Sequence, residues 1–102
     1  MDNIVFTESY ATNQEFPNIL ISNYGRVIDI HTKEEIKQKS YMKFKSIEIY
    51  NNENNKEIVY IHNLVYDTFH KDHKYTTIEH VDGNHLNNHY LNLKPYILKN
   101  NR

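Results

Sequence analysis

The residues best suited to chemistry lie in one stretch near the C-terminal end of the chain, from position 79 to 93. The stretch reads Glu-His-Val-Asp-Gly-Asn-His-Leu-Asn-Asn-His-Tyr-Leu-Asn-Leu. It places a carboxylate beside an imidazole, at Glu79 and His80, and adds an Asp-Gly-Asn sequence and three further asparagines. Because the chain has no cysteine, a metal ion here would be held by imidazole, carboxylate or amide oxygen.

Two other interpretations of this stretch are open from the residues alone. His80, His85 and His89 could form a zinc cluster, but seven histidines without cysteine give no familiar zinc spacing. The stretch could also be an asparagine-rich loop around a histidine whose hydrogen bonds are satisfied. The short polar residues of the stretch are expected to act in turns and caps rather than as metal ligands: Asp82, Asn84, Asn87 and Asn88.

Both glycines of the chain fall in predicted turns. Gly83 lies between Asp82 and Asn84, a setting that fits a turn with a positive φ. Gly25 lies in the sequence Ser22-Asn23-Tyr24-Gly25-Arg26-Val27. Since these are the only two glycines, their placement indicates that the backbone geometry of both turns matters.

The elements that must position these turns are predicted to be short strands. Residues 18–23 and 26–30 are β-branched segments that flank the turn at Gly25. Residues 41–50 predict one strand with a bulge, because Met42 and Phe44 alternate in opposite phase to Ile47 and Ile49. Residues 57–61 are expected to pair back antiparallel across an asparagine-rich hairpin loop at 51–55.

A single helix is predicted to follow these strands. Ile61, Leu64, Val65 and Phe69 form a helical stripe that indicates core packing, and the helix should run to about His70. A polar loop at 71–75 and a β-branched segment at 76–78 then lead into the stretch at 79–93. The pattern as a whole predicts an α+β fold.

Length and composition predict one domain over residues 1–102. With 38% hydrophobic and 13% aromatic residues, the 102-residue chain has enough apolar material for a single modest core. No apolar run approaches the roughly 18 residues needed to span a bilayer, and the acidic start of the chain does not resemble a signal peptide. We therefore expect an intracellular protein without a membrane partner.

The charge distribution is ambiguous about nucleic acids. The formal net charge of −1 lacks the basic excess typical of DNA-binding proteins. The first 24 residues contain no lysine or arginine, whereas five lysines crowd the next segment: Lys33, Lys37, Lys39, Lys43 and Lys45. Such a run is either a solvated face or a stripe that contacts phosphates.

Three motifs in order give the chain a resemblance to the HNH homing-endonuclease family of phages and large DNA viruses. Residues 22–27 resemble the element SNxGRV that often precedes such nuclease domains. Residues 61–69 resemble the helix VHRLVxxxF, and residues 79–93 resemble (D/N)HxDGNxxNNxxxNL. The match spans residues 16–101 and departs from the family at Asn63, usually Arg, and at Pro95-Tyr96, where Trp-Val is common.

The resemblance implies a fold in two parts. An N-terminal sheet element is expected over residues 16–61. A helix and a ββα-metal motif are expected over residues 62–102, in which a hairpin and a following helix hold one Mg²⁺ or Mn²⁺ ion. His80 matches the family's general base, and Glu79 and Asn101 match its metal ligands. Asn92 matches the asparagine that braces the loop presenting the histidine, with support from the turn at Asp82 and Gly83.

The implied function is a metal-dependent DNA endonuclease that nicks DNA or cuts both strands. His80 suits the base role because imidazole titrates near neutral pH. The residues expected to contact DNA phosphates lie in the 22–27 turn and the 41–61 hairpin, namely Arg26, Lys43 and Lys45. The alternative is a catalytically inactive module of the same fold that binds DNA or protein, and a homodimer is left open.

Overall fold

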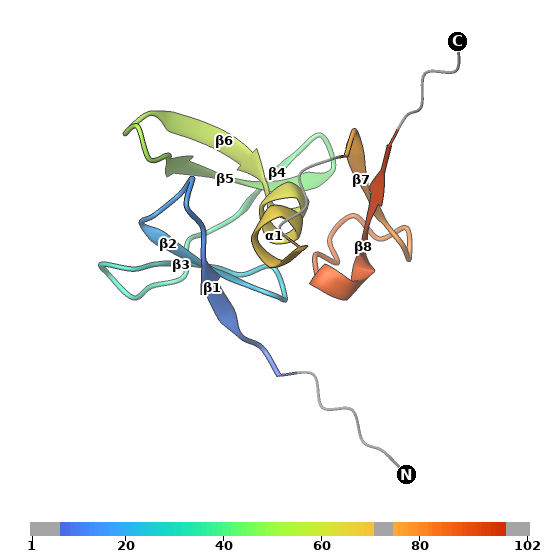
Figure 1. Cartoon of the computed structure of the whole chain (residues 1–102), viewed down its shortest axis with the longest axis horizontal. Coiled ribbons are helices and arrows are strands. Elements are labelled where there is room, and N and C mark those ends of the chain that lie inside the picture. Colours follow the sequence, from blue (N-terminus) through green and yellow to red (C-terminus); the bar gives the residue numbers. More distant parts are fainter. Residues whose placement is uncertain (1–6, 71–74, 98–102) are drawn as a thin grey trace.

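The computed structural model describes residues 7–70 and 75–97, and within them it has the α+β architecture that the sequence predicts. Figure 1 shows a central helix with two small sheets on one side and a separate hairpin on the other. The elements in chain order are β1 (Tyr10–Thr12), β2 (Ile19–Ser22), β3 (Val27–Asp29), β4 (Lys39–Tyr41), β5 (Phe44–Tyr50), β6 (Lys56–Tyr60), α1 (Ile61–His70), β7 (Thr77–His80), the 3₁₀-helix η1 (Tyr90–Asn92) and β8 (Leu93–Tyr96).

The first sheet is antiparallel, with strand order β1-β2-β3. The two strands predicted around Gly25 are confirmed as β2 and β3. A tight turn joins them, in which the amide of Ser22 donates to the Arg26 carbonyl at 2.8 Å and the amide of Gly25 donates to the Ser22 carbonyl at 3.0 Å. Strand β1 was not predicted, and it extends the sheet to the N-terminal side of the expected boundary at residue 16.

The second sheet has the order β4-β5-β6 and corrects one prediction. The predicted bulged strand over residues 41–50 is wrong: Tyr41 pairs directly with Phe44, so the chain reverses at Met42 and Lys43. Both turn residues have positive φ, at 52° and 77°, as in the two-residue hairpins that match the twist of the strands. The change of hydrophobic phase therefore comes from a turn. The pairing of β5 with β6 and the hairpin loop between them are confirmed.

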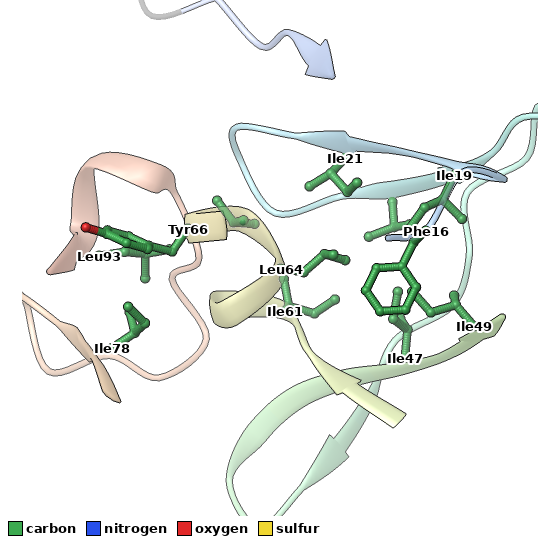
Figure 2. Packing of buried hydrophobic residues seen from close by; sticks show 12 residues of the cluster. Phe16, Ile19, Ile21, Ile47, Ile49, Ile61, Leu64, Tyr66, Ile78 and Leu93 are labelled. Atoms are coloured by element: carbon green, nitrogen blue, oxygen red, sulfur yellow. The ribbon is translucent and has the colours of Figure 1, made fainter. Parts of the chain in front are cut away.

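Helix α1 ends where the stripe predicts and forms the middle of the core. Ile61, Leu64 and Val65 are almost fully buried in one hydrophobic cluster. Figure 2 shows Ile61 and Leu64 on the side of the two sheets, whereas Tyr66 extends toward Leu93 of the hairpin. The helix therefore attaches the hairpin to the sheets through opposite faces.

The hairpin consists of β7 and β8, which pair antiparallel from Thr77 with Tyr96 to His80 with Leu93. Its inward residues, Ile78 and Leu93, belong to the hydrophobic cluster. Residues 71–74 of the predicted loop and the helix expected after β8 lie outside the described residues, as does Asn101. No helix in the described ranges is long and apolar enough to cross a membrane.

Candidate active site

Strand β7 presents its last two residues to opposite sides. His80 is buried, with 8% of its surface exposed, whereas Glu79 is exposed and pairs in register with Lys94 of β8. This is the alternation expected of a regular strand. Nevertheless, both side chains border the same open pocket of about 530 Å³, together with His85 and Lys94. The pocket thus joins an imidazole, a carboxylate and a cation.

The ring of His80 is oriented by a buried asparagine. Its Nε2 lies 2.8 Å from Oδ1 of Asn88, which is itself only 5% exposed. Because an amide oxygen can only accept, Nε2 of His80 must carry the proton, and the lone pair of the neutral ring then lies on Nδ1. Among the described residues Nδ1 has no hydrogen-bond partner. The interpretation of Asn88 as a turn or capping residue is therefore wrong.

Three aromatic rings enclose His80, and the sequence did not indicate that they meet there. Phe44 of β5 stacks at 6.2 Å between ring centroids, and His62 of α1 and His85 of the loop approach edge-on at 5.0 and 5.4 Å. Phe44 also contacts His62 and His85, at 5.0 and 4.9 Å. The rings come from three separate elements, so their sequence positions do not show that they meet. The one feature of the sequence that singled out His62 was its place in the helix motif.

His62 is held in its neutral form. Its pKa is lowered from 6.5 to about 4, chiefly by burial and then by the neighbouring imidazoles of His80 and His85. Its Nδ1 is buried without a hydrogen-bond partner among the described atoms. A charged ring at this position would be unsolvated and would face two other histidines, so His62 acts as an apolar wall behind His80.

The loop between β7 and β8 is braced by Asn92 and Asp82. The Nδ2 of Asn92 donates to Asp82 Oδ1 at 3.0 Å and to the Asn87 carbonyl at 2.9 Å, and the Asp82 amide donates to Asn92 Oδ1 at 3.0 Å. The pKa of Asp82 is lowered, first by the hydrogen bond from the Asn87 side chain, then by those from the Asn84 backbone amide and the Asn92 side chain. Gly83 has φ of +76° and its amide donates to the His80 carbonyl at 2.9 Å.

The N-terminal turn packs against this loop. The amide of Tyr90 donates to the Asn23 carbonyl at 2.8 Å, and the Tyr24 and His89 rings meet edge-on at 4.5 Å. Gly25 has φ of +96°, and a Cβ there would lie 2.9 Å from the Cβ of Asn88 and 3.3 Å from its carbonyl oxygen. Glycine is therefore required at position 25 for two reasons: the positive φ, and the lack of room for a Cβ beside Asn88, the residue that orients His80.

The three basic residues expected to contact DNA lie in two places. Arg26 and Lys45 line a second hollow of about 490 Å³, which is also lined by Gly25 and Asn88. The Nε of Arg26 forms an ion pair with Glu8 at 3.0 Å while its side chain stays 55% exposed. Lys43 is in the β4–β5 turn, with its Nζ 5.8 Å from the centre of the Phe44 ring.

The donor groups fit a hard divalent cation better than zinc. In residues 7–70 and 75–97, no three side chains among His, Cys, Asp and Glu converge as a metal-binding group. The His89 ring packs on Tyr24, and its Nδ1 accepts from the Leu91 amide at 3.1 Å, which removes it from a zinc cluster. Glu79 offers one exposed carboxylate at an open pocket, and Mg²⁺ is commonly held by one or two carboxylates together with substrate phosphates.

Small antiparallel sheets, one helix and a β-hairpin make the described part of the chain an α+β domain. It is similar to a solved structure that describes DNA binding and cleavage by the HNH homing endonuclease I-HmuI, with a TM-score of 0.69 and 23% sequence identity. The similarity covers 78% of this chain and 47% of that chain, so the present chain spans about half of that enzyme. No protein-family model and no curated protein sequence matched the chain.

Proposed function

We propose that this protein is a metal-dependent DNA endonuclease of the HNH type. One observation carries the proposal: Glu79 and His80 border one open pocket, and His80 is held with its unprotonated nitrogen free of any hydrogen bond among the described residues. A base needs a lone pair and a fixed direction, and Asn88 supplies both by holding the proton on the opposite nitrogen. The fold shared with a DNA-cleaving enzyme points to the same chemistry.

In this proposal His80 takes a proton from a water molecule through Nδ1, and the resulting hydroxide attacks the phosphodiester. Glu79, with Asn101 from outside the described residues, would hold Mg²⁺ or Mn²⁺. When bound, the ion stabilises charge on the phosphate and on the 3′-oxygen that leaves. Lys94, which lies opposite Glu79 on the hairpin, is placed to face a phosphate in the same pocket. The products would carry 5′-phosphate and 3′-hydroxyl ends.

The DNA is expected to follow the basic residues beside the pocket. Lys43 adjoins Phe44 at the pocket's edge, and Arg26 and Lys45 lie around the neighbouring hollow. The loop after β7 borders both hollows, because His85 lines the first and Leu86 and Asn88 line the second, so we expect one DNA backbone to pass both. These contacts would fix the position of the strand without reading its sequence.

The test is plasmid nicking by purified protein with Mg²⁺, with Mn²⁺ and with EDTA. His80→Ala should lower cleavage by roughly 10²- to 10⁴-fold, as is usual for loss of a general base, with DNA binding nearly unchanged. Glu79→Ala should weaken cleavage in a way that excess Mn²⁺ partly restores, since Mn²⁺ binds oxygen and nitrogen donors readily. Equal cleavage by both variants and the parent would place the active site elsewhere.

A second candidate is an inactive module of this fold that binds DNA without cutting it. Two observations favour it: His80 is only 8% exposed behind three aromatic rings, and the net charge is −1. DNA binding by a parent protein that never cuts with any divalent metal would select this candidate.

A further inference from the structure

We propose that Asn88 is a positioning residue that fixes the tautomer and orientation of His80, and that the N-terminal turn at Gly25 holds Asn88 in place. The role of Asn88 in catalysis rests on the proposed function. The orientation of the His80 ring is independent of that function and can be measured in the free protein. Because the Gly25 turn belongs to the N-terminal sheet, the proposal gives this sheet a part in the active site.

The first step is the hydrogen bond itself. Asn88 Oδ1 and His80 Nε2 lie 2.8 Å apart, and both side chains are at least nine-tenths buried. A hydrogen bond between buried groups is costly to lose, because water cannot replace the missing partner. The proton is therefore held on Nε2, and Nδ1 is kept as the acceptor.

The second step is what holds Asn88. Its loop is fixed from within by Asn92, which bonds the Asn87 carbonyl at 2.9 Å. It is fixed from outside by the 22–25 turn, through the bond from the Tyr90 amide to the Asn23 carbonyl at 2.8 Å. Gly25 lies so close that an added Cβ would be 2.9 Å from the Asn88 Cβ, so the turn packs directly against Asn88 and restricts its movement.

The third step concerns the rings around His80. Phe44, His62 and His85 contact its faces and edges, and none of the three is hydrogen-bonded to it. Packing alone permits a flip of the imidazole, which would exchange the positions of its carbon and nitrogen atoms at similar volume. Asn88 is the polar contact that distinguishes the two orientations among the described residues.

The experiment is ¹⁵N NMR of the histidine rings in the full chain at about pH 8, where an ordinary imidazole is neutral. In the parent, His80 should show a protonated Nε2, an unprotonated Nδ1 and a ring proton protected from exchange with water. Asn88→Ala should remove that protection and move both nitrogen shifts toward a tautomer average. Asn88→Asp keeps an acceptor for the Nε2 proton and should therefore keep Nε2 protonated and protected, without a tautomer average.

Cleavage gives the second measurement. Asn88→Ala should lower kcat by roughly 10- to 100-fold, as for other partners that orient a functional imidazole, with DNA affinity unchanged. Asn88→Asp should recover most of that loss. Asn55→Ala, which changes an exposed asparagine of the distant β5–β6 loop, is the matched control and should match the parent in both measurements.

The outcomes separate the two proposals. If the parent never cleaves but its His80 signals depend on Asn88 as described, the positioning role stands and the nuclease proposal fails. If Asn88→Ala is folded and leaves the His80 signals and cleavage unchanged, the positioning role is overturned. If Asn88→Ala does not fold, Asn88→Asp decides: a protonated, protected Nε2 supports the proposal, and a tautomer average overturns it.

Discussion

A pair of glycine substitutions measures how tightly the N-terminal turn is coupled to the site. Gly25 and Gly83 both have positive φ, at +96° and +76°, so alanine at either position adopts an unfavourable backbone conformation. That strain costs about 1–2 kcal/mol. Only at Gly25 does the new methyl group meet another residue, 2.9 Å from the Asn88 Cβ, whereas carbon atoms prefer to be about 3.5–4.0 Å apart. At Gly83 nothing lies within 4 Å.

Overpacking of a close contact costs about 1–3 kcal/mol in addition. We therefore expect Gly83→Ala to lower the free energy of unfolding by about 1–2 kcal/mol and Gly25→Ala by about 2–5 kcal/mol. For a domain of this size, the difference between the two variants should exceed about 4 °C in Tm. Urea denaturation and thermal unfolding followed by circular dichroism measure both quantities. Equal losses in the two variants would refute the steric contact between Gly25 and Asn88.

Three further predictions follow from the core, the second sheet and the basic residues. The pKa of His62 is lowered to about 4 in the folded protein, whereas an unfolded chain takes up this proton near pH 6.5. The free energy of unfolding should therefore fall by up to about 3 kcal/mol as the pH is lowered from about 6.5 to 4. His62→Phe should flatten that part of a plot of the urea midpoint against pH. Replacing Met42-Lys43 with Asn-Gly should raise Tm by several degrees, because Asn and Gly tolerate the positive φ at both positions; an unchanged Tm would contradict the turn assignment. Lys45→Glu should weaken DNA binding in low salt and reduce the slope of affinity against salt, and filter binding at several salt concentrations that shows no change would remove Lys45 from the DNA surface.

The elements with strong local signals were predicted correctly. The helix at 61–70 was predicted because its apolar stripe has one period, and the strands around Gly25 because a glycine marks the turn. The error at 41–50 has a physical cause: a reversal of hydrophobic phase is produced equally by a bulge or by a two-residue turn, and Met42-Lys43 lacks the Asn or Gly that usually marks a turn. Strand β1 is three residues long and mostly exposed, so it has almost no hydrophobic pattern.

The site was predictable only where its residues are neighbours in sequence. Glu79 and His80 and the loop that follows are consecutive, and motif resemblance located them. The partners of His80 come from β5, α1 and the loop after β7. The periodicity of one segment cannot reveal which residues of three different segments come into contact. Asn88 was misassigned because an asparagine in a polar loop is usually a turn residue, and only its burial distinguishes it. The roles of Glu79, His80 and Asn101 stay predictions.

The contact between the 22–25 turn and the 88–90 loop also has a consequence for how the protein is made. The two segments are separated by most of the chain, so bringing them together requires closure of a large loop, an entropic cost that slows folding. During synthesis the N-terminal sheet can form while its partner loop is still inside the ribosome. The pocket around His80 should therefore be the last part to take shape, and amide exchange during refolding should protect Tyr90 after the strands of both sheets.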